Sequence, residues 1–500
     1  MAVETRIEQL KDFEGREVVL KGWLAHKRSS KRVQFLIVRD GSGFCQCVVH
    51  EPEVDPELWA QAERVTQESA LWVRGLVRRD ERQIGGYELG VRELRILHLA
   101  EGYPITPKPH GVDFLLDRRH LWLRSRRQWA IMRIRHQVTS SIHAFFEEQG
   151  FLKLDAPIFT GNAVEGTTTL FETDFFGQPA YLSQSGQLYA EAMAMAFGRV
   201  YTFGPTFRAE KSKTRRHLAE FWMVEPEMAF FDLDMAMDLA EALVERIVQD
   251  VLRNRRFELS LLGRNPEVLE RVRRPFPRIT YTEAVELLRS PETQRLLEAD
   301  QEALLSERAA LKAEAETLRA EQEGSAPLRR GESEHRLAEI AHRLSEIEEE
   351  LKNIPLWRES ARNFRWGEDF GGSDETLLSR HFDRPVLVHR YPAAVKAFYM
   401  KRDPEDKRLA LGMDMLAPEG YGEIIGGGQR EDVLDHLIER IREHRLPLEA
   451  YAWYLDLRRY GSVPHAGFGL GLERTLAWIC GLRHVRETIP FPRMMGRLFP

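Results

Sequence analysis

The first hundred residues contain five short apolar segments that are separated by turns. The segments are rich in valine, leucine, isoleucine and aromatic residues, and glycine-containing turns at residues 40–43 and 84–86 separate most of them. One helical segment, residues 56–67, interrupts the series. We therefore expect a small β-barrel with strands at residues 17–24, 33–39, 44–49, 70–77 and 87–97.

Five strands with one helix between the third and the fourth is the usual plan of an OB-type barrel. The pattern favours equally a small barrel with no role in nucleic-acid binding. Cys45 and Cys47 lie on the same face of one predicted strand. No second cysteine pair is present to complete a metal site, so we expect both to be buried thiols.

Length and charge limit the class of protein. The 500 residues suggest about three domains. A formal net charge of −6 argues against a protein that coats nucleic acid non-specifically, although a local basic groove stays possible. The apolar runs are far shorter than the ~20 residues of a membrane span, and the polar N-terminus lacks a secretion signal. We expect a cytoplasmic protein that is not bound to a membrane.

The rest of the chain predicts a linker and a second, larger domain. Residues 101–124 contain several prolines and are expected to be a hinge between domain 1–100 and domain 125–500. Beyond residue 150, strands and helices alternate without the rhythm of a parallel sheet. Two long strands, residues 199–207 and 221–230, flank a polar loop. The prediction is an α+β chain whose second domain is an antiparallel sheet flanked by helices.

Residues 290–353 differ in composition from the rest and are dominated by Glu, Arg, Ala and Leu. Leucine recurs every seven residues from Leu297 to Leu318, and apolar residues step by three and four from Leu337 to Leu351. Two amphipathic helices with a Gly/Pro turn between them predict an antiparallel helical hairpin. We expect a solvated appendage with a narrow apolar seam, in preference to an arm that contacts a partner.

Three separated segments carry residues suited to chemistry. Residues 150–157 follow a long predicted helix and contain a glycine and a proline. In residues 207–221, Arg208 leaves one strand, a basic loop follows, and Phe221 begins the next strand. Cations there can hold a nucleotide's phosphates, and the ring can stack on its base. Residues 467–474 form a glycine-rich turn before a helix. Each segment alone is also explained as a surface hairpin or a packing turn.

In this order and at these distances, the segments resemble motifs 1, 2 and 3 of class II aminoacyl-tRNA synthetases. The resemblance extends from Gly22 to the C-terminus, except for the helical insertion. A barrel that precedes the catalytic domain is similar to the subgroup for aspartate, asparagine and lysine. The resemblance implies a ligase that uses ATP and tRNA, and a homodimer, because the motif 1 segment lies at the family's two-fold interface.

Five residues of this chain match family residues that bind the nucleotide. Arg208 resembles the motif 2 arginine that binds the α-phosphate, where negative charge develops. Glu210 matches an acid near the adenosine, and His217 a residue near the γ-phosphate. Phe221 matches the ring that stacks on adenine, and Arg474 resembles the motif 3 arginine that covers the other face of that base. The resemblance makes Arg208, Glu210 and Arg474 the expected catalytic residues.

Asp414 and Glu423 look like the acidic pair that holds Mg²⁺ against the phosphates, and hard oxygen ligands suit that ion. No side chain is needed as a nucleophile. In the family the amino acid's own carboxylate attacks ATP, and the terminal hydroxyl of the tRNA then attacks the adenylate. The expected role of the enzyme is positioning and charge stabilisation.

The choice of amino acid depends on a few positions. Aspartate enzymes of the family have a lysine that pairs with the substrate carboxylate, and Ala190 stands in its place here. The phrase around Glu225 is similar to asparagine enzymes: Glu225 would accept from the carboxamide NH₂ and Arg430 would donate to its oxygen. Three further positions match the ammonium site or line the pocket: Glu165, Ser185 and Gln187. One departure is Gly426–Gly428, where asparagine enzymes commonly have Gly-Gly-Ser.

In the barrel, Arg28, Phe35 and Gln46 match the family's anticodon-reading face, together with Gly22 and Trp23. Phe35 could stack on an unpaired base, and Arg28 and Gln46 could hydrogen-bond its edge. The alternative is that Phe35 belongs to the core and Arg28 to the surface.

We expect a homodimeric asparagine–tRNA ligase of the class II family that activates L-asparagine with ATP and charges tRNA(Asn). An aspartate enzyme is the alternative within the class. Paralogues that only bind RNA, or that amidate free aspartate, are the alternatives outside it.

Overall fold

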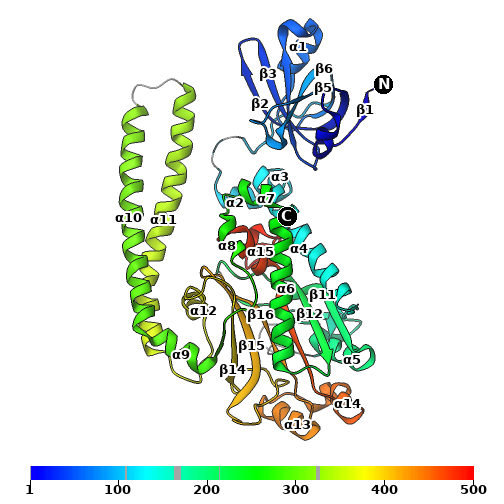
Figure 1. Cartoon of the computed structure of the whole chain (residues 1–500), viewed down its shortest axis with the longest axis vertical. Coiled ribbons are helices and arrows are strands. Elements are labelled where there is room, and N and C mark those ends of the chain that lie inside the picture. The colour runs from blue at the N-terminus through cyan, green and yellow to red at the C-terminus, as the bar shows by residue number, and fades with distance from the viewer. Residues whose placement is uncertain (1, 107, 109, 163–169, 213, 323–326) are drawn as a thin grey trace. The chain divides into compact units, whose positions relative to one another are not determined.

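The computed structural model describes residues 2–106, 108, 110–162, 170–212, 214–322 and 327–500. The chain divides into two compact units, Met1–Trp129 and Ala130–Pro500 (Figure 1). Among the described residues, no helix is long and apolar enough to cross a membrane.

Five strands of the first unit close into a barrel. Each pairs with two neighbours in the cyclic order β2–β3–β4–β6–β5, and β5 returns to β2. All pairs are antiparallel except β4 with β6. The short strand β1 (Val3–Glu4) joins β2 in parallel, and α1 (Pro56–Arg64) lies between the third and fourth barrel strands. The barrel strands are β2 (Glu17–Ser30), β3 (Val33–Arg39), β4 (Phe44–His50), β5 (Ala70–Arg79) and β6 (Tyr87–His98).

The alternation of side chains along these strands forms the barrel core. Leu36 and Val38 of β3 point inward, and Cys45 and Cys47 of β4 meet them. Both cysteines are buried free thiols, as expected from their spacing. The closed five-stranded barrel confirms the OB-type plan.

Strand β2 is six residues longer than the sequence predicts. Residues 17–23 pair with β5, and residues from Trp23 onward pair with β3. The register of the β2–β3 pairing shifts between Leu24 and His26. A bulge bends a strand sharply, which lets β2 belong to both sides of the barrel. The second half is polar and exposed, so its composition hides a strand.

Two short helices, α2 (Val112–Asp117) and α3 (Arg119–Trp122), lie within the segment predicted as a linker. Arg119 is buried there, with its guanidinium 4.7 Å above the Trp122 ring. The proline-rich first half of the segment is therefore followed by local helical packing. Pro107 and Pro109 lie outside the described residues.

An eight-stranded sheet forms the centre of the second unit. Its order is β13–β14–β15–β16–β17–β12–β11–β7, antiparallel except for the two edge pairs β13–β14 and β7–β11. A three-stranded sheet, β8–β10–β9, accompanies it. The predicted antiparallel sheet is confirmed. The strands are β7 (Leu152–Lys153), β8 (Phe159–Thr160), β9 (Glu172–Phe175), β10 (Gln178–Leu182), β11 (Arg199–Phe207), β12 (Glu220–Ala229), β13 (Arg278–Thr280), β14 (Val386–Pro392), β15 (Leu409–Ala417), β16 (Gly422–Gln429) and β17 (His465–Gly471).

Helices cover this sheet and build its core. Apolar residues of α4 (Arg126–Glu148), α6 (Leu233–Asn254) and α15 (Leu472–Cys480) pack in one cluster with the strands. A second cluster joins α5 (Gln187–Phe197), α13 (Leu434–Glu443) and α14 (Ala452–Arg459). The remaining helices before the insertion and after it are α7 (Arg256–Leu261), α8 (Pro266–Glu270), α9 (Tyr281–Arg289) and α12 (Gly372–Ser379).

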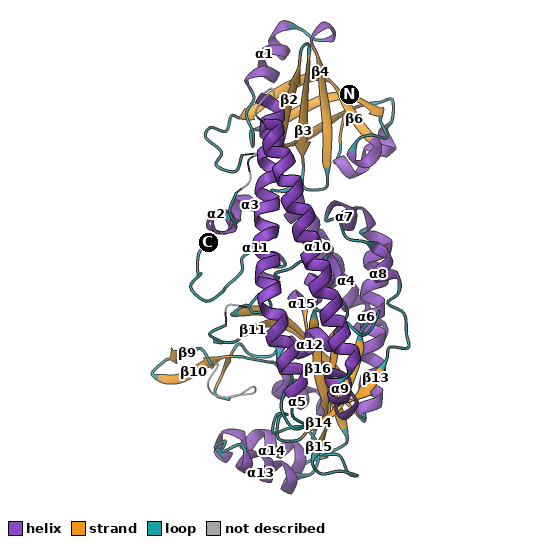
Figure 2. Ribbon diagram, turned by 90° about the vertical axis from the view of Figure 1, so that its left-hand side faces the viewer, coloured by secondary structure: helices purple, strands orange, loops and turns teal. Residues whose placement is uncertain are grey.

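The insertion is a pair of long helices, α10 (Pro291–Gln322) and α11 (Pro327–Asn363), that run side by side (Figure 2). Ile340 and Ile347 are buried in their seam, in line with the apolar repeat. Arg343 pairs with Glu307 across the seam at 2.6 Å. The hairpin thus has the narrow apolar contact that the sequence predicts. Most of its expected Gly/Pro turn lies outside the described residues.

The root of the hairpin is more than an appendage. Leu297 and Ile354 are at most 2% exposed and belong to a cluster with α9, α12 and β14. Arg215, in the loop between β11 and β12, pairs with Glu349 of α11 at 2.5 Å. Arg483 pairs with Glu346 of the same helix. The insertion is therefore anchored in the unit by apolar packing and by ion pairs.

This anchoring predicts different effects for two leucines of α10. Leu297→Ala removes a fully buried side chain and is expected to destabilise the unit by about 2–5 kcal/mol. Leu305, in the same helix, is 39% exposed, and Leu305→Ala is expected to change the stability by less than about 0.5 kcal/mol. Thermal unfolding of both variants measures the difference. Equal melting temperatures would contradict a packed root.

Candidate active site

Strand β12 turns acidic side chains toward one face of the sheet. Glu225 and Glu227 line a cavity on that face, whereas Val224 and Met228 lie in the core between sheet and helices. Successive residues of a strand point to opposite faces, so two carboxylates two positions apart reach the same cavity. Both are at most 5% exposed.

Strand β17 makes room for these acids. Gly467 pairs with Glu227 in the ladder, and a Cβ at Gly467 would overlap the Glu227 carboxylate. A Cβ at Gly469 would overlap the side chain of Met223. The intervening Phe468 is buried in the core. The glycine-rich segment, predicted as a turn, is in fact a strand, and its glycines lie on the face that bears the cavity.

The cavity has a volume of about 310 Å³. It brings together side chains from the start of α5, from β12, β15 and β16, and from the residue that follows β16. Glu165, the remaining residue predicted for the amino-acid pocket, lies outside the described residues. The sequence-predicted residues that line this cavity are Ser185, Gln187, Arg208, Glu225, Asp414, Glu423 and Arg430.

Glu225 is held by its neighbours at the start of α5. It accepts hydrogen bonds from the Ser185 hydroxyl, from the Gly186 N–H at 2.8 Å and from the Thr202 hydroxyl at 3.4 Å. Burial raises the pKa of the Glu225 carboxyl. Three donors leave part of its acceptor capacity for a ligand in the cavity, since a carboxylate has about four acceptor positions.

Arg430 pairs with Glu227 and not with Glu225. Its Nε and Nη2 both donate to the Glu227 carboxylate, and the two side chains are 3% and 1% exposed. Burial raises the pKa of the Glu227 carboxyl to about 7. The sequence prediction named Glu225 and missed Glu227, although both belong to one Glu-Pro-Glu phrase on the same face of β12.

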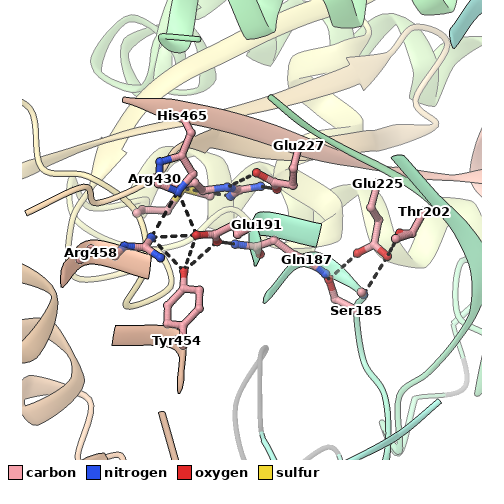
Figure 3. A network of polar contacts seen from close by, with 12 residues as sticks. Ser185, Gln187, Glu191, Thr202, Glu225, Glu227, Arg430, Tyr454, Arg458 and His465 are labelled. Carbon is pink, nitrogen blue, oxygen red and sulfur yellow. Dashed lines mark hydrogen bonds and ion pairs between the residues drawn. The ribbon is translucent and has the colours of Figure 1, made fainter. Parts of the chain in front are cut away.

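A buried polar network continues from the cavity to α14 (Figure 3). Gln187 and Glu191 of α5 lie one turn apart, and Gln187 Nε2 donates to Glu191 at 2.8 Å. Glu191 also accepts from Tyr454 at 2.7 Å and from Arg458 at 2.7 Å, and His465 lies 3.0 Å from it. Sequence reasoning missed Glu191, Tyr454, Arg458 and His465, since their charges meet only in the fold.

The residues predicted for the nucleotide line one further cavity. Arg208, Glu210, His217, Phe221 and Arg474 surround it together with Glu423. The Arg208 guanidinium lies 5.4 Å from the centre of the Phe221 ring, and His217 Nε2 lies 3.1 Å from the Glu210 carboxylate. Cations and an aromatic ring around one space are suited to phosphates and a base.

Arg216 also lines the nucleotide cavity and was not predicted. It donates to the hydroxyl of Thr376 at 2.5 Å and to the carbonyl oxygen of Gly420. Arg216 lies in the basic loop between β11 and β12, so composition alone cannot distinguish it from the neighbouring cations.

Three carboxylates converge where the two cavities meet. A Cβ at Gly426 would lie 2.7 Å from Glu423 and 3.4 Å from Asp414. Burial and the charge of Glu423 raise the pKa of Glu375 to about 7, and burial raises that of Asp414 to about 6 despite its 2.6 Å pair with Lys396. Crowded carboxylates fit a hard cation that takes one or two protein oxygens and completes its shell with phosphates and water. No three acids or histidines among the described residues enclose an ion by themselves.

The barrel carries its predicted residues on its outer face. Arg28 and Phe35 are opposite one another in the β2–β3 ladder, and the Arg28 guanidinium lies 4.7 Å above the Phe35 ring. Phe35 is half-buried, and Trp23 is 42% exposed on the same face. Gln46 is 8% exposed and donates to Glu88 at 3.1 Å. Phe35 is therefore not a core residue, while Gln46 already has a partner.

Comparison with known proteins gives two family matches. Residues 111–495 match the family described as tRNA synthetases class II (D, K and N). Residues 18–97 match the family described as OB-fold nucleic acid binding domain.

Individual relatives match over nearly the full length. The asparagine–tRNA ligase of Sorangium cellulosum is 55% identical over 97% of this chain and 96% of the relative, and that of Thermus thermophilus is 51% identical over 99% of both. The structure of asparaginyl-tRNA synthetase from Pyrococcus horikoshii complexed with asparaginyl-adenylate superimposes with a TM-score of 0.82, 37% identity and complete coverage of both chains. With its two cavities, its barrel and these matches, the chain belongs to the class II tRNA synthetases of the group for aspartate, lysine and asparagine.

Proposed function

We propose that this protein is an asparagine–tRNA ligase. The observation that carries the proposal is the balance of charge in the 310 Å³ cavity, where Arg430 is already paired with Glu227. The family resemblance adds that Ala190, a buried residue of α5, stands where an aspartate enzyme has a lysine. Of the described cations that line this cavity, Arg430 and Lys396 are paired with carboxylates, and Arg208 is assigned to the α-phosphate. A carboxylate side chain of a substrate would therefore find no cation of its own among them, whereas a carboxamide would find both acceptors and a donor. The names of the relatives support the same substrate.

Glu225 and Arg430 would recognise the two ends of the asparagine carboxamide. Glu225 accepts from the carboxamide NH₂, and Arg430 donates to the carboxamide oxygen while Glu227 fixes the direction of its guanidinium. Ser185 and Gln187, at the start of α5, complete the site around the ammonium group. We assign Glu165 to the same group on the family resemblance alone.

ATP occupies the second cavity. Phe221 and Arg474 enclose the adenine, Glu210 lies near the adenosine, and Arg208 and His217 hold the phosphates. Asp414 and Glu423 would hold Mg²⁺, which would neutralise phosphate charge when bound. The crowding of Glu375 around Glu423 supports a cation at this place.

The reaction proceeds in two balanced steps. A carboxylate oxygen of asparagine attacks the α-phosphorus, the bond to the bridging oxygen breaks, and diphosphate leaves. Arg208 stabilises the negative charge that accumulates on the α-phosphate oxygens. The terminal ribose hydroxyl of tRNA(Asn) then attacks the carbonyl carbon of the adenylate, loses its proton and releases AMP. The chain contributes orientation and charge in both steps.

The domain assignment follows from these roles. Residues 1–100 bind the anticodon, residues 101–124 connect, and residues 125–500 catalyse, with the hairpin 290–353 inserted. The outward face with Arg28 and the half-buried Phe35 supports anticodon binding, because an aromatic ring beside a cation can stack on an unpaired base. The middle uracil of the anticodon is the proposed target.

We also propose a homodimer that acts in the cytoplasm. Leu152 of the motif 1 segment, and Ile158 and Phe159 directly after it, are 43–50% exposed, which is apolar surface that a second copy could cover. An aspartate enzyme stays the alternative within the class, and Ala190 opposes it. Paralogues that only bind RNA, or that make asparagine from aspartate, are opposed by the presence of both the barrel and the complete nucleotide site.

Amino-acid-dependent exchange between ATP and diphosphate tests the substrate. Exchange is expected with asparagine and not with aspartate or lysine. Arg430→Gln removes a charge-assisted donor worth about 1.5–3 kcal/mol, so kcat/KM for asparagine should fall about 10- to 100-fold or more. Arg402→Gln, which breaks an exposed pair with Glu443, should change it less than about 3-fold. Exchange with aspartate in the unmodified protein would refute the pocket assignment.

The metal assignment predicts a change in magnesium dependence. Glu423→Gln removes one anionic ligand, so the Mg²⁺ concentration for half-maximal exchange should rise about tenfold, with part of the rate recovered at saturating Mg²⁺. Glu439→Gln, at an exposed position of α13, is the matched control and should leave this concentration unchanged. A Glu423→Gln variant with the magnesium dependence of the unmodified protein would rule out this ligand.

The barrel assignment predicts an effect on tRNA alone. Phe35→Ala should raise the KM for tRNA(Asn) roughly 5- to 100-fold, because stacking on one base contributes about 1–3 kcal/mol, and should leave exchange unchanged. Trp72→Ala removes a ring under Arg95, 4.5 Å from its guanidinium, on a different strand and serves as the control. Equal effects of the two substitutions would place the anticodon elsewhere.

A further inference from the structure

Gln187 has a defined amide orientation because of the residue one turn away. Its Nε2 donates to Glu191 Oε1 at 2.8 Å in a site where both side chains are buried. An ionised carboxylate only accepts hydrogen bonds, so the NH₂ end of Gln187 must face Glu191. The oxygen end is the one left for the cavity, and the described residues supply no hydrogen bond to it.

Glu191 is itself saturated with donors. Tyr454 donates to both of its oxygens, at 2.7 and 2.8 Å, and Arg458 donates to Oε2 at 2.7 Å. His465 Nε2 lies 3.0 Å from the same oxygen. Burial alone would raise the pKa of the Glu191 carboxyl, but Arg458 and His465 outweigh it and hold this pKa below its usual range. The carboxylate is therefore ionised and fixed in position.

We propose that Glu191 is a positioning residue that sets the polarity of the ammonium subsite, by holding the Gln187 amide with its oxygen toward the α-ammonium group of the substrate. This inference rests on the proposed function and deepens it. If the amide were reversed, its NH₂ would face the ammonium group and its oxygen would face the Glu191 carboxylate. Both contacts would be repulsive, so the ionised Glu191 allows one orientation only.

The Glu191 carboxylate is also connected, through His465, to Arg430 on the opposite side of the amino-acid cavity. The backbone carbonyl oxygen of His465 accepts from the Arg430 N–H at 2.9 Å, and the His465 ring contacts Glu191. Arg458 donates to the carbonyl oxygen of Glu431, the residue after Arg430, at 2.7 Å. The ends of β16 and β17 are thus fixed by the network that orients Gln187 (Figure 3).

The test compares two substitutions with opposite predictions. Glu191→Gln keeps the size of the side chain but presents an amide that can donate or accept, so Gln187 can adopt both orientations. The KM for asparagine in exchange should rise at least tenfold, with the KM for ATP unchanged. Glu191→Asp changes the volume more but stays acceptor-only, and its KM for asparagine should lie nearer that of the unmodified protein. A role limited to packing volume predicts the opposite order, so a larger effect of Glu191→Asp would overturn the proposal. Loss of the Arg458 ion pair alone would give the same order, so a second measurement must show which substrate group is affected.

Two fragments of asparagine show which group of the substrate is bound more weakly by the Glu191→Gln variant. Succinamate has the carboxamide and the carboxylate but no ammonium group, and its inhibition constant against asparagine should be the same in Glu191→Gln and in the unmodified protein. 3-Aminopropanamide keeps the ammonium group and should bind at least fivefold more weakly to the variant. Equal weakening of both fragments would mean that the whole pocket has collapsed, which would refute a role specific to the ammonium subsite.

A double-substitution cycle identifies the residue through which Glu191 acts. In a Gln187→Ala background, Glu191→Gln should cause no further rise in the KM for asparagine, whereas an additive rise would exclude Gln187 as the intermediary. Glu241→Gln is the matched control, because Glu241 is a buried carboxylate that pairs with Arg278 away from the cavity. It should lower the melting temperature without changing that KM. Lack of exchange with every amino acid in the unmodified protein would refute the proposed function itself, independently of these variants.

Discussion

The burial of four charged side chains around the amino-acid cavity constrains the rest of the catalytic unit. Glu191, Arg458, Glu227 and Arg430 are each at most 3% exposed. A buried charge is tolerated only when it is paired and hydrogen-bonded, and removal of one partner is destabilising by about 3–5 kcal/mol. The two ion pairs therefore fix α5 against α14, and β12 against the end of β16. The walls of the cavity are thus held together by contacts within the protein itself.

This pairing also explains why an uncharged side chain suits the cavity. The guanidinium groups of Arg430 and Arg458 are each matched by a carboxylate inside the protein, so neither is left to pair with a carboxylate side chain of a substrate. A carboxamide needs only one donor and one acceptor, which Arg430 and Glu225 can supply without a change in net charge. The proposed selection of asparagine over aspartate rests on charges that are already compensated in the free protein. Gly467 of β17 leaves the space in which Glu227 pairs with Arg430.

Local patterns predicted most of the fold, because they act over a few residues. Alternation placed the barrel strands and the buried Cys45 and Cys47, and the seven-residue repeat identified the hairpin. The second half of β2 was missed because its polar residues face solvent, and the strand β17 was taken for a turn because glycine weakens strand propensity. In both places tertiary pairing decides the structure and local propensity does not.

The side-chain pairs of the site could not be predicted from local patterns, because the residues that pair are distant in sequence. Arg430 lies 203 positions from Glu227, and Arg458 lies 267 positions from Glu191. No local rule decides whether Glu225 or Glu227 receives the arginine when both face the same cavity. The nucleotide residues were easier, since Arg208, His217 and Phe221 occur in one strand–loop–strand segment whose geometry follows from its sequence. The family resemblance placed some of these distant residues in one pocket. The structure shows which of them form pairs.

The helical insertion shows how the same principles link distant elements to the site. Its outer part needs only a narrow apolar seam and exposed ion pairs, each of which contributes little by itself. Its root, by contrast, contributes Leu297 and Ile354 to a buried cluster, and Glu349 to a pair with Arg215. Arg215 belongs to the loop that carries His217 at the nucleotide cavity. The hairpin and the loop beside the nucleotide cavity are therefore in direct contact, through an exposed pair that by itself contributes little to stability.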